Sequence, residues 1–348
     1  MADIKLSFCI PTYNRADYIG QTLRSIATQI IEIGCADCIE ICISDNASTD
    51  ATDAVIQDFK ADHPSVRLVL SKNSTNLGAD RNYLRVVELA SGEYCWLFGS
   101  DDTLVPGAIC DMLQELQRNY DIILSNRIMC DMNLNRLRNQ QWLDSKSGSF
   151  VYRFSDTKEI KRYLENARSL GALFSYLSSI IVRRNAWNDV RLDETFIGTA
   201  YVHVHILLSI VLSGSILKYH LEPTVLCRGG NDSFATEGIA KRYLIDLDGY
   251  QMLADHFFYG NSVRAAFKAV LRREHKWYFF VGVANKVKKQ GKWDELAYKL
   301  RSFGYHPAML YIVGKLGASK FVMSLARYFR HKLLGVTPTK PNTKGIDL

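Results

Sequence analysis

The chain has 348 residues, of which 47% are hydrophobic and 23% charged, and it carries a formal net charge of +7. This length suffices for one large domain or two smaller ones, and the composition is ordinary for a soluble globular protein. The apolar, uncharged stretch at roughly residues 201–217 is shorter than the ~18 residues that a membrane-spanning helix needs.

Charge is divided unevenly along the chain. Residues 241–348 hold 20 Lys and Arg against 7 Asp and Glu, whereas residues 1–240 hold 23 against 29. A basic C-terminal third predicts contact with an anionic surface, either lipid or nucleic acid. No secretory signal pattern opens the sequence, so we expect a cytoplasmic protein.

A short apolar strand is predicted at residues 6–10, and a helix is predicted to begin near Asp17 because apolar residues then recur at helical spacing. The polar and aromatic loop between them could cradle a base and a ribose. A plain strand-to-helix turn would explain the same residues. The loop residues considered for nucleotide binding are Pro11, Thr12, Tyr13 and Arg15.

Two more strands are predicted, at residues 39–43 and 66–70. Asp45 follows the first of them and could accept a hydrogen bond from a pyrimidine N–H, although an Asx turn and a helix cap would also explain the segment. The loop after the second contains Asn76 and Gly78, and Gly78 permits an unusual backbone turn. Arg81 lies near the start of the next helix, where it could face a phosphate together with the helix N-terminus.

An apolar and aromatic run, residues 93–98, predicts a buried strand that ends at Gly99-Ser100-Asp101-Asp102. Ligands of open α/β sheets bind outside the carboxyl ends of the strands. Adjacent carboxylates there are well placed to hold a hard divalent cation, which could bind and neutralise a diphosphate. Three strand–helix units precede this strand, and the alternation predicts an α/β fold with a mostly parallel sheet and flanking helices.

The ordered motifs PTYNR, SDNASTD, NLGADRN and SGEYCWLFGSDD resemble the nucleotide-binding half of a family 2 glycosyltransferase of the Rossmann-like GT-A fold. The resemblance covers roughly residues 5–130 and extends more weakly to about residue 230. It implies a nucleotide-sugar donor, a divalent cation (Mn or Mg) and transfer of the sugar to an acceptor hydroxyl. It further implies that Pro11, Tyr13 and Asp45 contact the nucleoside and that Arg81 lies near the nucleotide and its diphosphate. It also implies that Asp101 is the principal metal ligand, with Asp102 and Ser100 beside it.

The sequence departs from the family at two places. An Asp is common where this chain has Gly99, so one carboxylate is missing; we expect Asp101 to retain the cation with fewer protein ligands, and a weak or dispensable metal is the alternative. The Glu-Asp pair that commonly supplies the base is also missing, and His203 lies at its position. His203 could act as a general base near neutral pH or could be a helix residue that hydrogen-bonds in the core or acceptor pocket. Asp193 and Glu194 are rival candidates, and a mechanism that retains the anomeric configuration would need no such base.

Further strands are predicted at residues 216–220 and 222–227, followed by Arg228 and the glycine pair of the motif GGND. In the resembled family the equivalent strand ends in a basic residue that approaches the donor diphosphate, and Arg228 fits by residue type. A flexible hairpin is the alternative. The motifs GGND and GSDD and the missing Glu-Asp pair resemble the branch that transfers dideoxyhexoses in O-antigen assembly, such as abequosyltransferases.

Three regions are expected: a catalytic domain at residues 1–235, a basic helical region at 236–335 and a flexible tail at 336–348. The apolar stripes and basic residues of the second region, including a stripe at residues 321–329, suit amphipathic helices on an anionic membrane surface. A helical bundle with a solvated basic face is the alternative.

The leading hypothesis is a glycosyltransferase that moves a sugar from a nucleotide-sugar donor to a saccharide acceptor, expected to be lipid-linked, at the inner face of the cytoplasmic membrane. The first alternative is a nucleic-acid-binding protein, because basic and aromatic residues interleave around Trp277. The sequence contains no RRM, KH or zinc-finger signature, so we expect no nucleic-acid partner. The second alternative, a nucleotidyltransferase, should carry a glycine- and basic-rich phosphate loop that PTYNR does not match. The sequence does not predict the oligomeric state.

Overall fold

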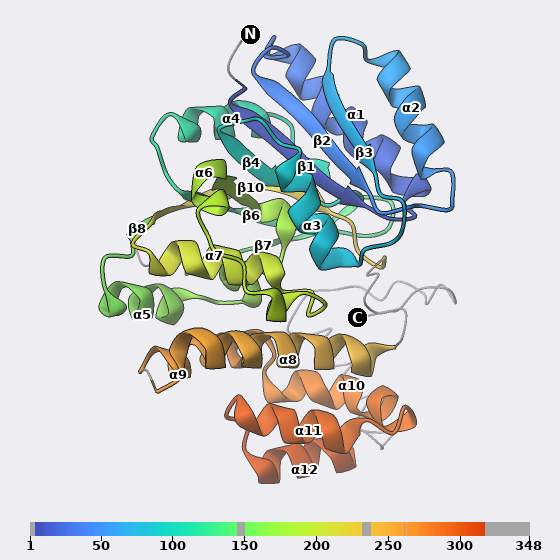
Figure 1. Cartoon of the computed structure of the whole chain (residues 1–348). Helices are drawn as coiled ribbons and strands as arrows, with labels where there is room; N and C mark the ends of the chain where they lie inside the picture. The colour runs from blue at the N-terminus through green and yellow to red at the C-terminus, as the bar shows by residue number, and fades with distance from the viewer. Residues whose placement is uncertain (1–3, 145–149, 232–237, 261, 317–348) are drawn as a thin grey trace. The chain divides into compact units, whose positions relative to one another are not determined.

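The computed structural model of the chain describes residues 4–144, 150–231, 238–260 and 262–316 (Figure 1). The chain divides into two compact units, one of residues 1–167 and 171–229 and one of residues 168–170 and 230–348. The domain boundary expected at residue 235 lies in a segment outside the described residues and stays a prediction. The expected stripe at residues 321–329 and the expected tail at 336–348 also lie outside the described residues.

Within the described residues, the first unit contains one sheet of ten strands. They are β1 (Leu6–Thr12), β2 (Ile39–Asp45), β3 (Arg67–Lys72), β4 (Tyr94–Leu97), β5 (Thr103–Leu104), β6 (Ile122–Cys130), β7 (Arg136–Gln140), β8 (Val151–Arg153), β9 (Ile180–Arg183) and β10 (Ile216–Cys227). The main order is β3-β2-β1-β4-β9-β6-β10-β5, with β7 beside β6 and β8 beside β10. The predicted mostly parallel sheet is therefore confirmed, with antiparallel strands added to it.

The direction of the strands decides where a ligand can bind. β3, β2, β1 and β4 are parallel neighbours. β9 is antiparallel to both β4 and β6, and β10 is parallel to β6. The carboxyl ends of β1, β2, β3, β4, β6 and β10 consequently lie along one edge, which is where open α/β sheets bind ligands.

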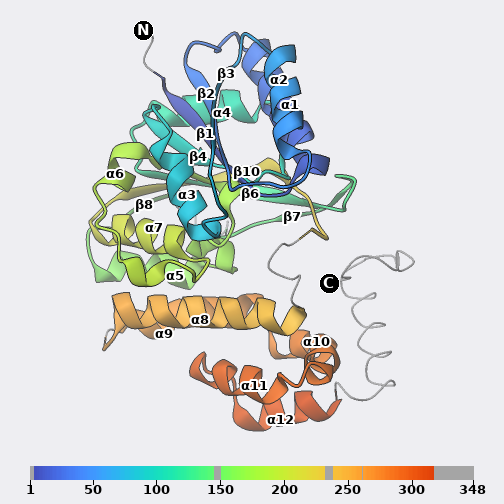
Figure 2. The same ribbon diagram turned by 45° about the vertical axis from the view of Figure 1, so that its right-hand side comes forward.

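Helices cover both faces of this sheet (Figure 2). Their bounds are α1 (Ala16–Glu32), α2 (Thr52–Asp62), α3 (Ala79–Glu88), α4 (Ala108–Leu116), α5 (Thr157–Asn166), α6 (Arg184–Asn188) and α7 (Val202–Leu212). Ile19, Leu23 and Ile26 of α1 are fully buried in one core cluster with strand residues and with α2 and α4. Each such side chain stabilises the fold by about 1.5–3 kcal/mol through burial. Helix α3 packs on β1 and β2 and against α7.

The second unit is helical, as expected. Its described helices are α8 (Ile239–Phe258), α9 (Val263–Glu274), α10 (Trp277–Lys289), α11 (Trp293–Ser302) and α12 (Pro307–Leu316). They enclose an aromatic and aliphatic core of their own, which includes Tyr250, Leu253, Phe267, Phe280 and Leu296. In the described part of the chain, no helix combines the length and apolar character needed to cross a membrane.

Candidate active site

The loop after β1 is fixed to the loop after β2 by hydrogen bonds. The backbone N–H of Asn14 donates to Ser48 Oγ at 2.9 Å, and that of Arg15 donates to Thr52 Oγ1 at 2.8 Å. Asn14 has a φ of 52°, a left-handed conformation that Asn tolerates better than most residues. This arrangement leaves the Tyr13 side chain 43% exposed at the sheet edge. Pro11 and Thr12 therefore end β1, and Tyr13 and Arg15 lie in the loop that follows directly and has a defined shape.

Asp45 is the most informative side chain at this edge. It ends β2 directly opposite Thr12 of β1 and is almost fully buried. Its Oδ1 atom accepts hydrogen bonds from the backbone N–H and the hydroxyl of Ser48, at 3.0 and 2.5 Å. Its Oδ2 atom and the Thr12 hydroxyl are buried and have no hydrogen-bond partner in the described part of the chain. Two polar atoms on neighbouring strand ends are thus available to a ligand.

A third loop joins the same network through two buried asparagines. Asn46 donates to Asn76 Oδ1 at 2.8 Å and accepts from the backbone N–H of Leu77 at 2.8 Å. Asn82 donates to the carbonyl of Ser44 at 3.0 Å and accepts from the Ser44 hydroxyl at 2.7 Å. Gly78 precedes α3 with a φ of 82°, so the unusual turn predicted there is confirmed.

Helix α3 connects this edge to the segment before α7. The Arg81 guanidinium lies 3.2 Å from a carboxylate oxygen of Glu194, with both side chains at least half exposed. Its neighbour Asp80 is buried, and its carboxylate accepts hydrogen bonds from the backbone N–H groups of Gly198, Ala200 and Val202 at 2.8, 2.8 and 3.3 Å. Burial raises the pKa of Asp80, while these N–H groups oppose the rise. Asp80 therefore caps the start of α7.

The two acids after β4 have different surroundings. Asp101 is half-buried at the sheet edge, whereas Asp102 is turned into the protein. Asp102 Oδ2 accepts hydrogen bonds from the hydroxyls of Tyr176 and Ser178, both at 2.6 Å, and Oδ1 accepts from the backbone N–H of Arg228 at 3.2 Å. Burial, and then the charge of Asp101, raise the pKa of Asp102 to about 7. The role of Asp102 as a metal ligand stays a prediction, and its protein contacts give it a structural role.

Gly99 is part of the same cluster. Its backbone N–H donates to Ser178 Oγ at 2.8 Å. A Cβ atom at this position would lie 2.9 Å from Asp102 Oδ2 and 3.2 Å from Ser178 Oγ. Those distances are shorter than ordinary van der Waals contact. The hydrogen-bonded side chains of Asp102 and Ser178 thus fill the space that an acid at position 99 would need. The Ser100 side chain, next to Gly99, is buried.

Arg228 joins β10 to the acidic turn. Its Nε atom donates to the carbonyl of Asp101 at 3.0 Å, and another guanidinium nitrogen donates to Gln21 Oε1 at 2.7 Å. The guanidinium also lies 5.1 Å from the centre of the Tyr18 ring. Arg228 is therefore buried next to Asp101, with its backbone and side chain both contacting the Asp101-Asp102 turn.

The three candidates for the base lie in different environments. His203 is buried in α7: one ring nitrogen lies 3.1 Å from the carbonyl of Phe174, and the other has no partner among the described residues. Burial lowers the pKa of His203 to about 4. This is the environment of a core histidine, the second of the two interpretations given to it, and its role as a base stays a prediction. Asp193 accepts hydrogen bonds from Thr195 at 2.6 and 2.9 Å, while Glu194 is exposed beside Arg81.

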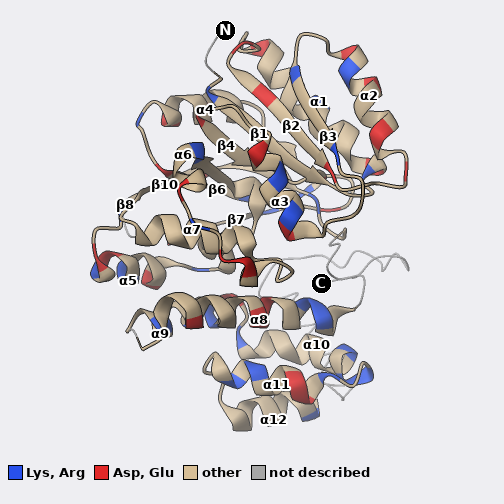
Figure 3. Ribbon diagram, viewed as in Figure 1, with Lys and Arg blue, Asp and Glu red and all other residues tan. Residues whose placement is uncertain are grey.

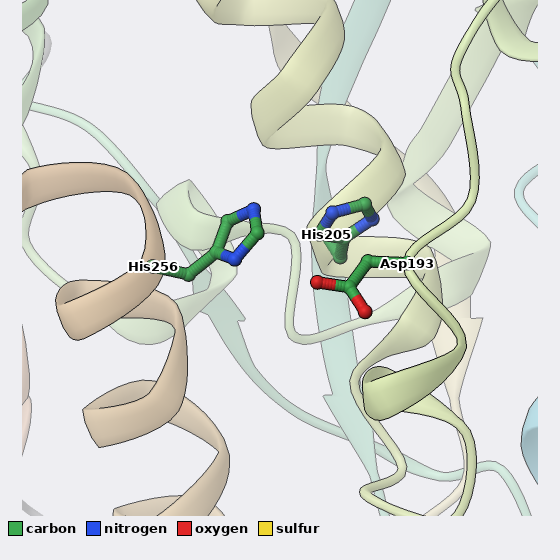
Figure 4. A group of neighbouring side chains, drawn as sticks. All are labelled: Asp193, His205 and His256. Carbon is green, nitrogen blue, oxygen red and sulfur yellow. The ribbon is translucent and has the colours of Figure 1, made fainter.

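Asp193 also has a neighbour that the sequence did not indicate. Figure 4 shows its carboxylate beside the ring of His205, and the two side chains offer ligand atoms within 4.8 Å of each other. The His205 ring stacks on Phe196 with 4.5 Å between ring centres.

These observations define a class of protein. A mostly parallel sheet with helices on both faces brings a buried acid after β2 and an acidic turn after β4 to one edge, and this is the arrangement of GT-A glycosyltransferases. The model of glycosyl transferase family 2 matches residues 7–186. The chain belongs to that family, and it is a glycosyltransferase.

Individual relatives agree with this assignment. The chain is 42% identical to the abequosyltransferase RfbV of Salmonella typhimurium over 278 residues, which are 79% of this chain and 82% of the relative. It is 25% identical over 191 residues to the GalNAc(5)-diNAcBac-PP-undecaprenol beta-1,3-glucosyltransferase of Campylobacter jejuni, covering 53% of this chain and 55% of that protein. The predicted resemblance to family 2 and to its abequosyltransferase branch is confirmed.

Solved structures show the same fold. TarS of S. aureus, residues 1–349, is similar with a TM-score of 0.59 and 18% identity, covering 93% of this chain and 87% of that one. The mannosyltransferase PcManGT of Pyrobaculum calidifontis, in complex with GDP-Man and Mn2+, is similar with a TM-score of 0.52 and 16% identity, covering 95% of this chain and 86% of that one. The predicted GT-A fold is therefore confirmed.

Proposed function

We propose that this chain transfers a sugar from a nucleotide-sugar donor to a hydroxyl of a lipid-linked saccharide during synthesis of an O-antigen-like polysaccharide. The single observation that carries the proposal is the buried Asp45 carboxylate, whose Oδ2 atom has no partner in the described chain and which shares the sheet edge with Asp101. The relatives support the substrate classes. One is named an abequosyltransferase, and another is named for a saccharide joined through PP to undecaprenol.

Asp45 is assigned to the base of the nucleotide. A buried acceptor without a partner costs about 1–3 kcal/mol, and a ligand N–H that pairs with it removes this cost. The Thr12 hydroxyl offers a second contact on the neighbouring strand. Tyr13 presents an exposed aromatic ring, which suits stacking on a base. TarS and PcManGT were solved with UDP-GlcNAc and GDP-Man, respectively.

Asp101 is assigned to the divalent cation. Mg²⁺ in nucleotide sites is commonly held by one or two carboxylates, substrate phosphates and water, so one half-buried carboxylate is a sufficient protein ligand. A bound Mn²⁺ or Mg²⁺ would neutralise charge on the departing diphosphate. Asp102 and Arg228 hold the turn that carries Asp101, through the hydrogen bond between the Arg228 backbone and Asp102 and the one between the Arg228 side chain and the Asp101 carbonyl.

The base for the acceptor hydroxyl is assigned to the Asp193-Glu194 segment and not to His203. A base must reach its proton within hydrogen-bond distance. Glu194 is exposed and lies next to Arg81, the residue expected near the diphosphate. His203 is enclosed in the core, and burial lowers its pKa to about 4, which makes it a weak base.

The second unit is assigned to the membrane side of the reaction. Residues 241–348 are strongly basic, and basic helical segments bind anionic leaflets with about 1 kcal/mol per Lys or Arg near the surface. A lipid-linked acceptor would be met at that surface, so we place the enzyme at the inner face of the cytoplasmic membrane.

The proposal is tested by measuring nucleotide release from a panel of nucleotide sugars, with and without Mn²⁺ or Mg²⁺. We expect cation-dependent release that Asp101→Asn abolishes. The matched control is Asp111→Asn, which neutralises an exposed acid on α4 and should leave release unchanged. Absence of nucleotide binding and release with every donor, or an Asp101→Asn variant equal to the unmodified chain, would contradict the proposal.

A further inference from the structure

A surface cavity of about 230 Å³ lies in the second unit, beside the start of α10 and the segment between α11 and α12. We call it the α10 groove. Its lining residues are Arg272, Lys276, Trp277, Tyr278, Gly304, Tyr305 and Met309. Two of them are cationic, three are aromatic and none is acidic.

The cations of the groove are available to an anion. Arg272 donates one hydrogen bond to the carbonyl of Phe303, and this bond uses one of the five N–H donors of the guanidinium group. Lys276 is exposed, and neither cation forms an ion pair with any described residue. Glu274 is close along the chain, but its carboxylate accepts a hydrogen bond from the backbone N–H of Leu170 at 2.7 Å. Figure 3 shows further Lys and Arg on α8, α10 and α11 of the same unit.

Two of the three aromatic residues of the groove are exposed. Trp277 and Tyr278 follow Lys276 directly and are 45% and 58% exposed, with their rings edge to face at 5.9 Å. Tyr305, in contrast, is buried and donates its hydroxyl proton to the carbonyl of His275. Trp and Tyr with one apolar and one polar end are the side chains that proteins place at the membrane–water interface. Beside two cations, they favour a ligand that is both anionic and amphipathic.

The size of the groove indicates what part of a ligand enters it. Pockets that enclose a whole small molecule measure about 300–1,000 Å³, so a cavity of about 230 Å³ fits one end of a larger ligand. A single-stranded nucleic acid would need a basic groove that follows about 4–16 nucleotides. The lining of this cavity comes from the end of α9, the start of α10 and residues 304–309.

We propose that the α10 groove binds the phosphate headgroup of an anionic phospholipid at the bilayer surface. Arg272 and Lys276 pair with the phosphate, while Trp277 and Tyr278 enter the headgroup layer. This inference rests on the proposed membrane-side function and gives it a particular site.

The test measures binding of the full chain to sedimented vesicles of phosphatidylcholine with and without phosphatidylglycerol. We expect binding to phosphatidylglycerol vesicles that weakens with added salt. Lys276→Gln should lower the vesicle partition coefficient about fivefold, the factor that corresponds to about 1 kcal/mol for one basic residue at an anionic leaflet. Trp277→Ala should lower it at least as much. The controls are Lys289→Gln, in the last turn of α10, and Tyr298→Ala, an exposed aromatic on α11; both should remain within twofold of the unmodified chain.

Nucleotide release from soluble donors is measured on the same variants and separates the two proposals. Loss of vesicle binding with unchanged donor release supports the groove. Equal vesicle binding by Lys276→Gln, Trp277→Ala and the controls would overturn it, as would equal binding to vesicles without phosphatidylglycerol. The proposal would also be overturned if the chain bound a single-stranded oligonucleotide and no vesicles, and if the same two substitutions abolished the binding of that oligonucleotide. Absence of donor release in the unmodified chain would contradict the proposed function and leave the vesicle result to judge the groove.

Discussion

Restoring the missing family acid by Gly99→Asp should destabilise this chain and should not strengthen its metal site. The Cβ atom of the new residue would lie 2.9 Å from Asp102 Oδ2 and 3.2 Å from Ser178 Oγ. Asp102 is buried, and Tyr176 and Ser178 donate to its Oδ2 atom at 2.6 Å. The new side chain would displace one or both donors and bring a second carboxylate against a buried one.

The cost follows from these contacts. A hydrogen bond to a charged group contributes about 1.5–3 kcal/mol, and overpacking a filled site costs about 1–3 kcal/mol. We therefore expect Gly99→Asp to lower the free energy of unfolding by about 3–5 kcal/mol. Gly99→Ala, which adds only the Cβ atom, should lower it by about 1–3 kcal/mol. At about 2–4 °C per kcal/mol, Gly99→Asp should lower the Tm by roughly 6–20 °C.

The assay is thermal unfolding of both variants, followed by titration with Mn²⁺. The control is Gly282→Ala on α10, where an added Cβ atom meets nothing within 4 Å and the helix should gain up to about 1 kcal/mol. A Gly99→Asp variant that unfolds at the same temperature as the unmodified chain and binds Mn²⁺ more tightly would refute this reasoning. It would mean that the Tyr176 and Ser178 contacts do not fill the position of the missing acid.

Three further outcomes are expected. Asp45→Asn can keep the contact with Ser48 through Oδ1, but it replaces the acceptor Oδ2 by an N–H donor. The nucleotide affinity measured by calorimetry should therefore fall about 10- to 100-fold, and an unchanged affinity would exclude a contact between this side chain and the base. Glu194→Gln should change the Tm by less than about 4 °C, because an exposed ion pair contributes at most about 1 kcal/mol. Arg81→Gln should raise the KM for the donor, and equal donor KM values for the two variants would count against Arg81. The folded-state pKa of His203, about 4, lies below its ordinary value of 6.5, so the unfolded chain binds more protons between these pH values. About 3 kcal/mol of stability is therefore lost as the pH falls from 6.5 to 4. Urea unfolding at several pH values should show a smaller loss in His203→Gln, and identical pH profiles for the two proteins would contradict this prediction.

The sheet and the positions of the residues proposed to bind the nucleotide could be predicted, because local patterns determine them. The apolar runs that became β1, β2, β3 and β4 each end in polar residues, and parallel strands place such ends on one edge. The turn with positive φ at Gly78 followed from its residue type. The partners of the acidic turn could not be predicted, because Tyr176 and Ser178 are 74 and 76 residues from Asp102 in the sequence.

The surroundings of Asp80 and His203 depend on tertiary packing. Asp80 lies inside the recognised NLGADRN motif, yet its contacts are with backbone groups 118–122 residues away. His203 occupied the expected position along the chain, but periodicity could not show that nearly all of α7 is buried. The apolar character of α7 on every side is the one signal that favoured a core position for His203, because a helix that is hydrophobic all round is typically buried.

Asp101 is proposed to hold the cation that binds the donor diphosphate. The decisive measurement is calorimetric titration of the full chain with UDP, CDP, GDP and dTDP, with and without Mn²⁺, in the unmodified chain and in Asp101→Asn. We expect at least one nucleoside diphosphate to bind in a Mn²⁺-dependent way, and we expect Asp101→Asn to remove the dependence while the Tm changes little. Mn²⁺-dependent binding of equal strength in both proteins would contradict it.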